Sequence, residues 1–148
     1  MDRMLWRIEE MGEDRVSAYF AGLFDGEGCV RLSTRRSPVL KVSIVNTDAR
    51  PLRHLHRQFG GSITEHTWGA RHGRPWRRSY EWQVAAGIAR SFLRWIAPYV
   101  LIKREQVDIA LEFLATRRAD RSTKRLTPEE QALYEGFRLA LQTAKHEC

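Results

Sequence analysis

Apolar and polar residues alternate along three stretches of the chain, 29–36, 39–44 and 79–84, and a fourth stretch, 62–68, has Thr64 and His66 on the face opposite Ile63. This period of two is typical of half-buried strands with one polar face. Ser37-Pro38 separates the first two stretches and is typical of a turn, so we expect these strands to form a hairpin. The side chains on its exposed face are mainly Arg, Lys and Ser.

Between and after these strands, apolar residues recur with helical spacing. We expect helices over about 14–24, 47–59, 88–96, 104–116 and 127–144. Thr47 is the expected N-cap of the second helix, and Thr127-Pro-Glu-Glu130 forms a capping box for the last. Strands with one polar face and helices on the other predict an α+β sandwich.

Composition and charge narrow the class of protein. The 148 residues are 43% hydrophobic and 29% charged, which is ordinary for a globular chain. We expect one domain over 1–148, with a core over about 14–116 and a helical C-terminal extension over 117–148. No apolar run approaches ~18 residues, so we expect no membrane span. Two cysteines make neither a disulfide framework nor a zinc site, which favours a reducing, intracellular location.

The net charge of +7 is unevenly distributed. Residues 31–78 contain eleven Lys and Arg against two acids, a balance of +9, which leaves −2 for the rest. A basic half of this kind suggests a polyanionic partner. A generic RNA-binding surface or a solvated basic face would have the same composition, so charge alone does not separate these alternatives.

The segment 17–29 has the most specific pattern in the chain. Ala18, Gly22 and Asp25 share one face of the expected helix, and that face is nearly bare of side chains. Glycine inside a helix costs about 1 kcal/mol relative to alanine, which makes sense if another backbone must approach closely. Glu27 stands at the helix exit, where an acid opposes the helix dipole, so a cation is expected there. The alternative is an ordinary core helix with a glycine cap and a solvated Glu.

The sequence Phe20-Ala-Gly-Leu-Phe-Asp-Gly-Glu-Gly28 resembles the signature of the LAGLIDADG homing endonucleases. The resemblance covers about 17–115 and implies an αββαββα fold with a four-stranded antiparallel sheet that binds DNA, helices on one side and extra C-terminal helices. It also implies that the signature helix pairs with a second copy. We find one motif in the chain, so the expected assembly is a homodimer. The residues expected at its interface are Ala18, Ala21, Gly22 and Asp25.

The resemblance implies a catalytic set and a metal site. The catalytic residues would be Glu27, Asn46, Arg50 and Lys103. Glu27 and Gly26 would bind a divalent metal. Mg²⁺ is expected, Mn²⁺ is an alternative, and Ca²⁺ is expected to support binding without cleavage.

Double-stranded DNA is the expected partner, and no small-molecule substrate is expected. A two-stranded ribbon fits the major groove. The candidates for base contacts are Arg31, Ser33, Arg35, Lys41, Ser43, Thr64, His66, Glu81 and Gln83. The candidates for phosphate contacts, which position the protein without specifying sequence, are Arg36, Arg71, Arg74, Arg77 and Arg78.

These observations predict a site-specific, metal-dependent endonuclease of the intron-homing type that cuts both strands of a long pseudo-palindromic site as a homodimer. A non-cutting nucleic-acid-binding protein of the same fold, such as an RNA maturase or a DNA-binding regulator, is the alternative. An unrelated RNA-binding domain would expose aromatic residues for base stacking. Here Tyr80 and Trp82 fall on the expected core side of their strand.

Overall fold

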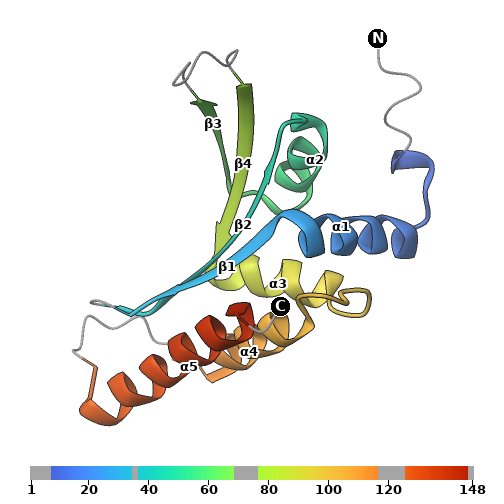
Figure 1. Ribbon diagram of the computed structural model, residues 1–148. Helices are drawn as coiled ribbons and strands as arrows, with labels where there is room; N and C mark the ends of the chain where they lie inside the picture. The colour runs from blue at the N-terminus through green and yellow to red at the C-terminus, as the bar shows by residue number, and fades with distance from the viewer. Residues whose placement is uncertain (1–7, 35–36, 69–76, 117–125, 147–148) are drawn as a thin grey trace.

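The structure is a computed structural model that describes residues 8–34, 37–68, 77–116 and 126–146. Four strands form one antiparallel sheet in the order β1-β2-β4-β3 (Figure 1). The strands are β1 (Gly28–Ser33), β2 (Val39–Asn46), β3 (Ser62–Trp68) and β4 (Arg77–Ala85). The helices are the short 3-10 helix η1 (Ile8–Glu10), α1 (Glu13–Glu27), α2 (Ala49–Phe59), α3 (Ala86–Ile96), α4 (Arg104–Thr116) and α5 (Pro128–His146). The predicted α+β class and αββαββα order are confirmed, followed by the two further helices α4 and α5.

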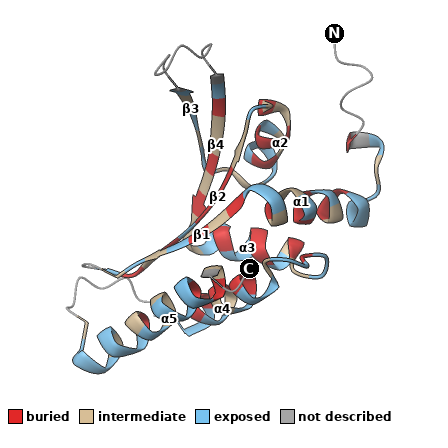
Figure 2. Cartoon of the chain, viewed as in Figure 1, coloured by how far each residue is buried: buried red, intermediate tan, exposed pale blue. Residues whose placement is uncertain are grey.

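The helical side of the sheet contains the core (Figure 2). Val30, Val42, Ile44 and Trp82 point to this side and are fully or almost fully buried against the helices. An aromatic cluster joins the layers. For example, the ring centroids of Trp82 and Phe92 lie 4.9 Å apart. Burial of these large rings is the main stabilising contribution expected for this layer.

The opposite side of the sheet, which we call the polar sheet face, follows from strand register. Arg31 pairs with Lys41 across β1 and β2, and Thr64 pairs with Glu81 across β3 and β4. Paired residues of antiparallel strands project to the same side. The predicted base-contact residues of the described strands, namely Arg31, Ser33, Lys41, Ser43, Thr64, His66, Glu81 and Gln83, therefore share one face.

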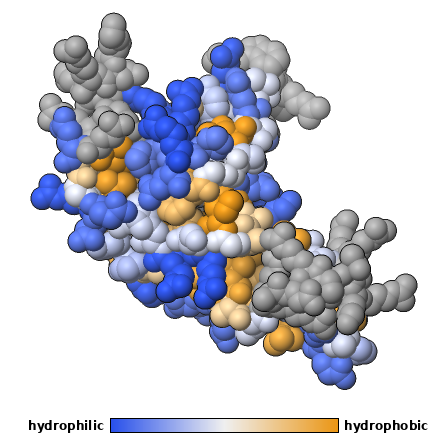
Figure 3. All heavy atoms as spheres, turned by 180° about the vertical axis from the view of Figure 1, so that it is seen from behind, coloured by the Kyte–Doolittle hydropathy of each residue, from blue (hydrophilic) through white to orange (hydrophobic). Residues whose placement is uncertain are grey.

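Hydrophilic residues cover much of the surface seen from behind, with small hydrophobic patches between them (Figure 3). No helix in the described ranges is both long enough and apolar enough to cross a membrane.

α5 packs on α4 and reaches β1. Phe113 of α4 makes edge contacts with Tyr134 and Phe137, with centroid distances of 5.5 and 5.7 Å. The Thr34 hydroxyl, just beyond β1, donates to Glu135 Oε2 at 3.1 Å. The predicted capping box is confirmed, since Glu130 N donates to Thr127 Oγ1 at 3.1 Å and Thr127 N donates to Glu130 Oε1 at 3.2 Å.

α1 extends further than the sequence pattern predicts. The expected helix ended at about residue 24, but Gly26 also lies inside α1, and Gly28 is the C-cap. A Cβ at Gly28 would lie 2.2 Å from the Phe24 ring, so only glycine lets the chain turn into β1 here. Glu27 is therefore the last helical residue, followed at once by the strand.

Candidate active site and nucleic-acid interface

Glu27 is exposed at the C-terminus of α1, where the last carbonyl groups have no helical donor. Within the described part of the chain, its carboxylate makes no hydrogen bond or ion pair. Gly26 is also exposed. A carboxylate and backbone carbonyls at this end form a concentration of negative charge and oxygen donors. This end of the helix can therefore attract a cation.

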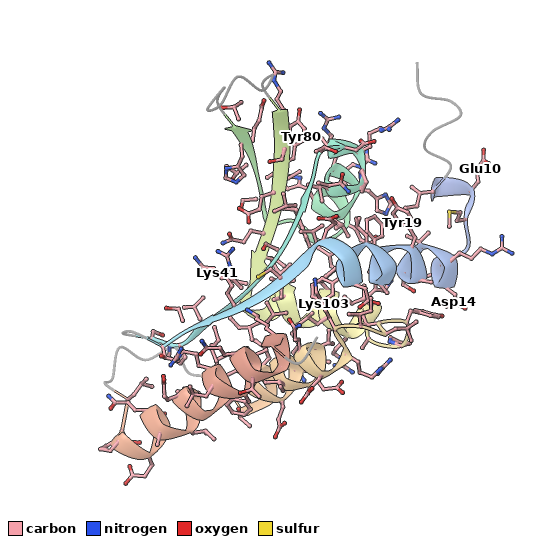
Figure 4. All side chains as sticks on the ribbon, viewed as in Figure 1. Glu10, Asp14, Tyr19, Lys41, Tyr80 and Lys103 are labelled. Atoms are coloured by element: carbon pink, nitrogen blue, oxygen red, sulfur yellow. The ribbon has the colours of Figure 1, made fainter. Side chains whose placement is uncertain are left out.

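Lys103 lies just before α4, and its ammonium group reaches the same end of α1 (Figure 4). Lys103 Nζ donates to the carbonyl of Phe24 at 3.2 Å and to the carbonyl of Gly28. It also lies 5.7 Å from the centroid of the Phe24 ring. A cation in this position compensates the helix dipole. The predicted catalytic lysine thus sits beside Glu27 and caps the helix that carries it.

Asp25 fixes the segment that supplies this lysine. Its carboxylate accepts hydrogen bonds from Leu101 N at 2.9 Å and from Lys103 N at 3.0 Å. The carboxylate oxygens of Asp25 are bonded within the chain, and its expected place at an interface with a second copy stays a prediction. The same expectation for Ala21 is wrong, because Ala21 is 0% exposed and packs in the core. Ala18 and Gly22 retain surface exposure.

Asn46 and Arg50 belong to a local chain of hydrogen bonds at the start of α2. Asn46 Oδ1 accepts from Asp48 N at 2.9 Å. Asp48, rather than the predicted Thr47, is the N-cap of α2, and its Oδ1 accepts from Arg50 N at 3.0 Å and Arg50 Nε at 2.9 Å. These bonds from Arg50 lower the pKa of Asp48 to about 2. Both predicted catalytic residues are therefore held by Asp48, which the sequence analysis did not select.

Strand register places β2 beside the residue that follows α1. Gly28 pairs with Ile44, and Asn46 is the last residue of β2, two positions further along the strand, where it pairs with Tyr80 of β4. The structure brings Lys103 to the end of α1 that carries Glu27, whereas Asn46 and Arg50 lie together at the start of α2, with Arg50 in its first turn.

Tyr19 of α1 is a further residue with a link to this site, although no sequence motif marks it. It is 42% exposed. Burial of part of the ring and the charge of Asp48 raise the pKa of its hydroxyl, and the charge of Arg50 opposes this effect. Tyr19 therefore lies within electrostatic range of the Asp48–Arg50 pair. No local motif signals this, because the contact crosses from α1 to α2.

The donor set of one chain fits a hard cation only in part. Among the described residues, no group of three or more His, Cys, Asp or Glu side chains could hold a metal ion. Glu27 and the Gly26 carbonyl offer oxygen donors of the type that Mg²⁺ prefers. A complete site needs further oxygens from outside the chain, such as a second Glu27 or phosphate groups.

On the polar sheet face, accessibility separates the predicted DNA contacts. Arg31, Ser33, Lys41 and Thr64 are exposed, and His66, Glu81 and Gln83 are partly exposed. Ser43 is only 6% exposed between its paired neighbours on β1 and β4, so the expectation that it contacts a base is corrected.

The predicted phosphate contacts are less well defined by the structure. Arg78 lies on the helical side of β4, opposite the polar sheet face, and its Nε is 3.5 Å from Glu65 Oε1. Arg77 belongs to β4, but its side chain is not described. Four other predicted DNA contacts lie outside the described residues, namely Arg35, Arg36, Arg71 and Arg74.

Comparison with known proteins identifies the fold. No protein-family model matches the chain, and no curated protein matches it. A crystal structure of the homing endonuclease I-CvuI in complex with its target in the presence of 2 mM Ca matches with a TM-score of 0.58 at 16% identity, over 90% of this chain and 96% of that one. The chain therefore has the homing-endonuclease fold that its LAGLIDADG-like motif predicted.

Two further structures support the assignment of the fold. I-CvuI in complex with the I-CreI target in the presence of 2 mM Mg, with DNA not cleaved, matches with a TM-score of 0.53 at 15% identity, over 90% of this chain and 97% of that one. The archaeal intron-encoded homing endonuclease I-Vdi141I complexed with DNA matches with a TM-score of 0.51 at 15% identity, over 90% and 99%.

Proposed function

We propose that this chain is a site-specific DNA endonuclease that cuts both strands of double-stranded DNA as a homodimer and depends on a divalent metal. One observation carries the proposal. The Glu27 carboxylate is exposed at the end of α1, one residue before Gly28, whose carbonyl accepts a hydrogen bond from Lys103 Nζ. Lys103 already places one positive charge at this helix end, and a divalent cation beside the exposed carboxylate would add to the compensation of the helix dipole.

The exposed face of α1 supports pairing with a second copy. A Cβ placed on Gly22 or Gly26 would meet nothing within 4 Å. Ala18 lies one turn before Gly22 and is also small. Ala18, Gly22 and Gly26 therefore form a stripe of small residues along α1. A second helix can approach this stripe closely, because the distance between two helix axes depends on the side chains at the contact. A two-fold axis through the stripe would bring the two Glu27 side chains toward each other.

Exposed apolar side chains lie around the same helix. Leu101 is 80% exposed and Ile102 is 65% exposed, in the segment that Asp25 holds against the end of α1. Tyr19, on α1 itself, is 42% exposed. Apolar groups gathered in this way favour burial in an interface. They therefore support the proposed homodimer independently of the glycines.

In the proposed dimer, the two Glu27 carboxylates, the Gly26 carbonyls and DNA phosphates would hold the metal. Mg²⁺ or Mn²⁺ supplies Lewis acidity and a water molecule with a lowered pKa when bound. Lys103 holds the end of α1 in place and adds positive charge near the scissile phosphate. The Asn46 amide would orient water, and Arg50 would offset negative charge that develops on the phosphate.

A non-cutting nucleic-acid-binding protein of this fold is the second candidate, and a specific observation favours it. The Arg50 guanidinium is paired with Asp48, and the Lys103 ammonium is bonded to carbonyls of α1. If these bonds persist on DNA, both cations are structural. A cleavage assay distinguishes the two candidates, because both predict binding and only the first predicts turnover.

The test is incubation of the purified chain with a randomised double-stranded DNA library and Mg²⁺, followed by sequencing of the cut ends. We expect cuts in both strands at one pseudo-palindromic sequence. Cut ends without a common sequence would contradict site specificity. Intact DNA, together with sequence-specific binding, would establish the second candidate instead.

Sedimentation velocity tests the assembly. We expect the wild type to be a dimer at micromolar concentration and Gly22→Leu to be a monomer or a weakened dimer, because the added side chain fills the stripe. Gly136→Leu is the matched control, since Gly136 is also an exposed helical glycine with open space around it. A wild-type monomer would contradict the proposed pairing of α1.

A further inference from the structure

The polar sheet face has one acidic side chain among its described strand residues, Glu81. The same face carries the basic residues Arg31 and Lys41, which pair with each other across β1 and β2 and suit phosphate or guanine. A carboxylate facing DNA is repelled by the phosphates, so it weakens binding unless it makes a specific favourable contact. Glu81 would therefore favour binding only where the DNA presents a hydrogen-bond donor to its carboxylate.

Glu81 lies in the interior of the sheet, between Val45 of β2 and Thr64 of β3. Its side chain is 20% exposed, so the carboxylate is accessible but confined. Glu81 Oε1 lies 3.3 Å from Nε2 of His66, whose side chain is 43% exposed. A carboxylate has acceptor capacity for several donors, so this contact orients Glu81 and leaves room for another hydrogen bond.

Strand register places Arg31 of β1 and Glu81 of β4 on the same face of the sheet. The pKa of the Arg31 guanidinium is raised mainly by a hydrogen bond to Cys29, and the charge of Glu81 adds a smaller effect. The carboxylate and the guanidinium therefore belong to one surface, which is the surface proposed to face DNA.

The chemistry of the base edges selects the partner. In the major groove guanine presents only acceptors, and thymine presents an acceptor and a methyl group. Adenine presents a donor beside the N7 acceptor, which repels a carboxylate. Cytosine presents the N4 amino donor without that acceptor, and Glu accepts from it. A confined carboxylate therefore favours cytosine over the other three bases.

We infer that Glu81 reads a cytosine in each half-site of the target by accepting a hydrogen bond from its N4 amino group, and that His66 is the positioning residue that holds Glu81 for this contact. The inference rests on the proposed function, which it deepens by naming a base. Under this inference, Glu81 selects cytosine over the other bases, which the basic residues of the polar sheet face do not do.

The test is selection of bound DNA from a randomised library in Ca²⁺, with the base frequency measured at every position. For the wild type we expect one position per half-site at which cytosine binds about tenfold better than other bases. Glu81→Gln should shift the preference at that position alone to adenine, because an amide pairs with adenine N6 and N7. Glu81→Ala should remove the preference.

Glu65→Gln is the matched control. Glu65 lies on the neighbouring strand and on the opposite side of the sheet, so its loss should leave the base frequencies unchanged. His66→Ala should weaken the cytosine preference at the same position, and His66→Gln, which retains a donor, should restore it. Unchanged His66 profiles would overturn the positioning role.

The outcomes separate failure of this inference from failure of the proposed function. Sequence-specific binding by the wild type, with the same profile for Glu81→Gln and Glu81→Ala, would overturn the assignment to cytosine and leave the endonuclease proposal standing. A uniform loss of affinity for all sequences would overturn it as well, since that marks a structural role. No sequence preference in the wild type would contradict the proposed function itself.

Discussion

Replacing Asp25 by Ala tests how the end of α1 is held. The wild-type carboxylate accepts from Leu101 N and Lys103 N at 2.9 and 3.0 Å, so it ties the segment before α4 to α1. Alanine is a better helix former than aspartate, but it removes both acceptors. The two N–H groups then lose their partners, and the backbone that carries Lys103 is no longer fixed.

The magnitude follows from the surroundings of the two bonds. A hydrogen bond to a charged group stabilises a fold by about 1.5–3 kcal/mol. Leu101 is 80% exposed, so water replaces most of its lost bond, whereas Lys103 is only partly exposed. We therefore expect a loss of about 2 kcal/mol in the free energy of unfolding, close to the value of one such bond. For a chain of this length that lowers Tm by about 6 °C.

Denaturant titration and calorimetry at one fixed protein concentration measure both quantities. Asp108→Ala, an exposed acid on α4, is the control and should change stability by less than about 0.5 kcal/mol. A double-mutant cycle with Lys103→Met should show a coupling above about 0.5 kcal/mol, because both side chains hold the same helix end. Additive effects, or a stability of Asp25→Ala equal to wild type, would refute this reasoning.

Three further predictions concern stability. Because the folded-state pKa of Asp48 is lowered from 3.8 to about 2, its contribution is present above about pH 4 and is lost as pH falls toward 2. We expect this contribution to the free energy of unfolding to be about 1 kcal/mol, because the Asp48 side chain is 41% exposed and solvent screens its charge. Unfolding measured as a function of acid pH should show that Asp48→Asn lacks this loss of stability. Ala86 has a φ of +52°, so Ala86→Gly should raise Tm or leave it unchanged, and a clear fall would contradict strain there. Glu135→Gln weakens the contact with Thr34, so backbone amides near Thr34 should exchange faster by mass spectrometry, and unchanged exchange would mean that α5 does not support the end of β1.

Local pattern was sufficient to predict most elements of the fold. The bounds of β3 and α4 match the predicted ranges 62–68 and 104–116, because glycines flank β3 on both sides and helical spacing is unbroken in α4. The end of α1 was placed too early. Gly26 faces open space and stays helical, whereas contact with the Phe24 ring, a three-dimensional effect, fixes the turn at Gly28.

The candidate site was predictable only where a motif marks it. Glu27 follows from the resemblance, and its place at the helix exit follows from the glycines around it. The role of Asp25 does not follow from its neighbours, because its partner Leu101 lies 76 residues away in the sequence. Likewise, helical spacing groups Ala21 with the small residues of α1, but only packing shows that it faces the core.

Glu27→Gln is the most direct test of the central claim that α1 ends in a metal-binding carboxylate used for DNA cleavage. The substitution keeps the shape of the side chain and removes its charge. The measurement combines a nicking and double-strand-break assay in Mg²⁺ with a gel-shift titration in Ca²⁺, and Glu112→Gln, an exposed acid of α4, serves as the control.

We expect Glu27→Gln to bind the target as tightly as wild type or more tightly, because a negative charge near phosphate has been removed. Its cleavage rate should fall by orders of magnitude, because the metal can no longer be held at the scissile phosphate. Cleavage at the wild-type rate would place the site elsewhere. Loss of binding together with cleavage would mean that Glu27 maintains the fold and not the metal site.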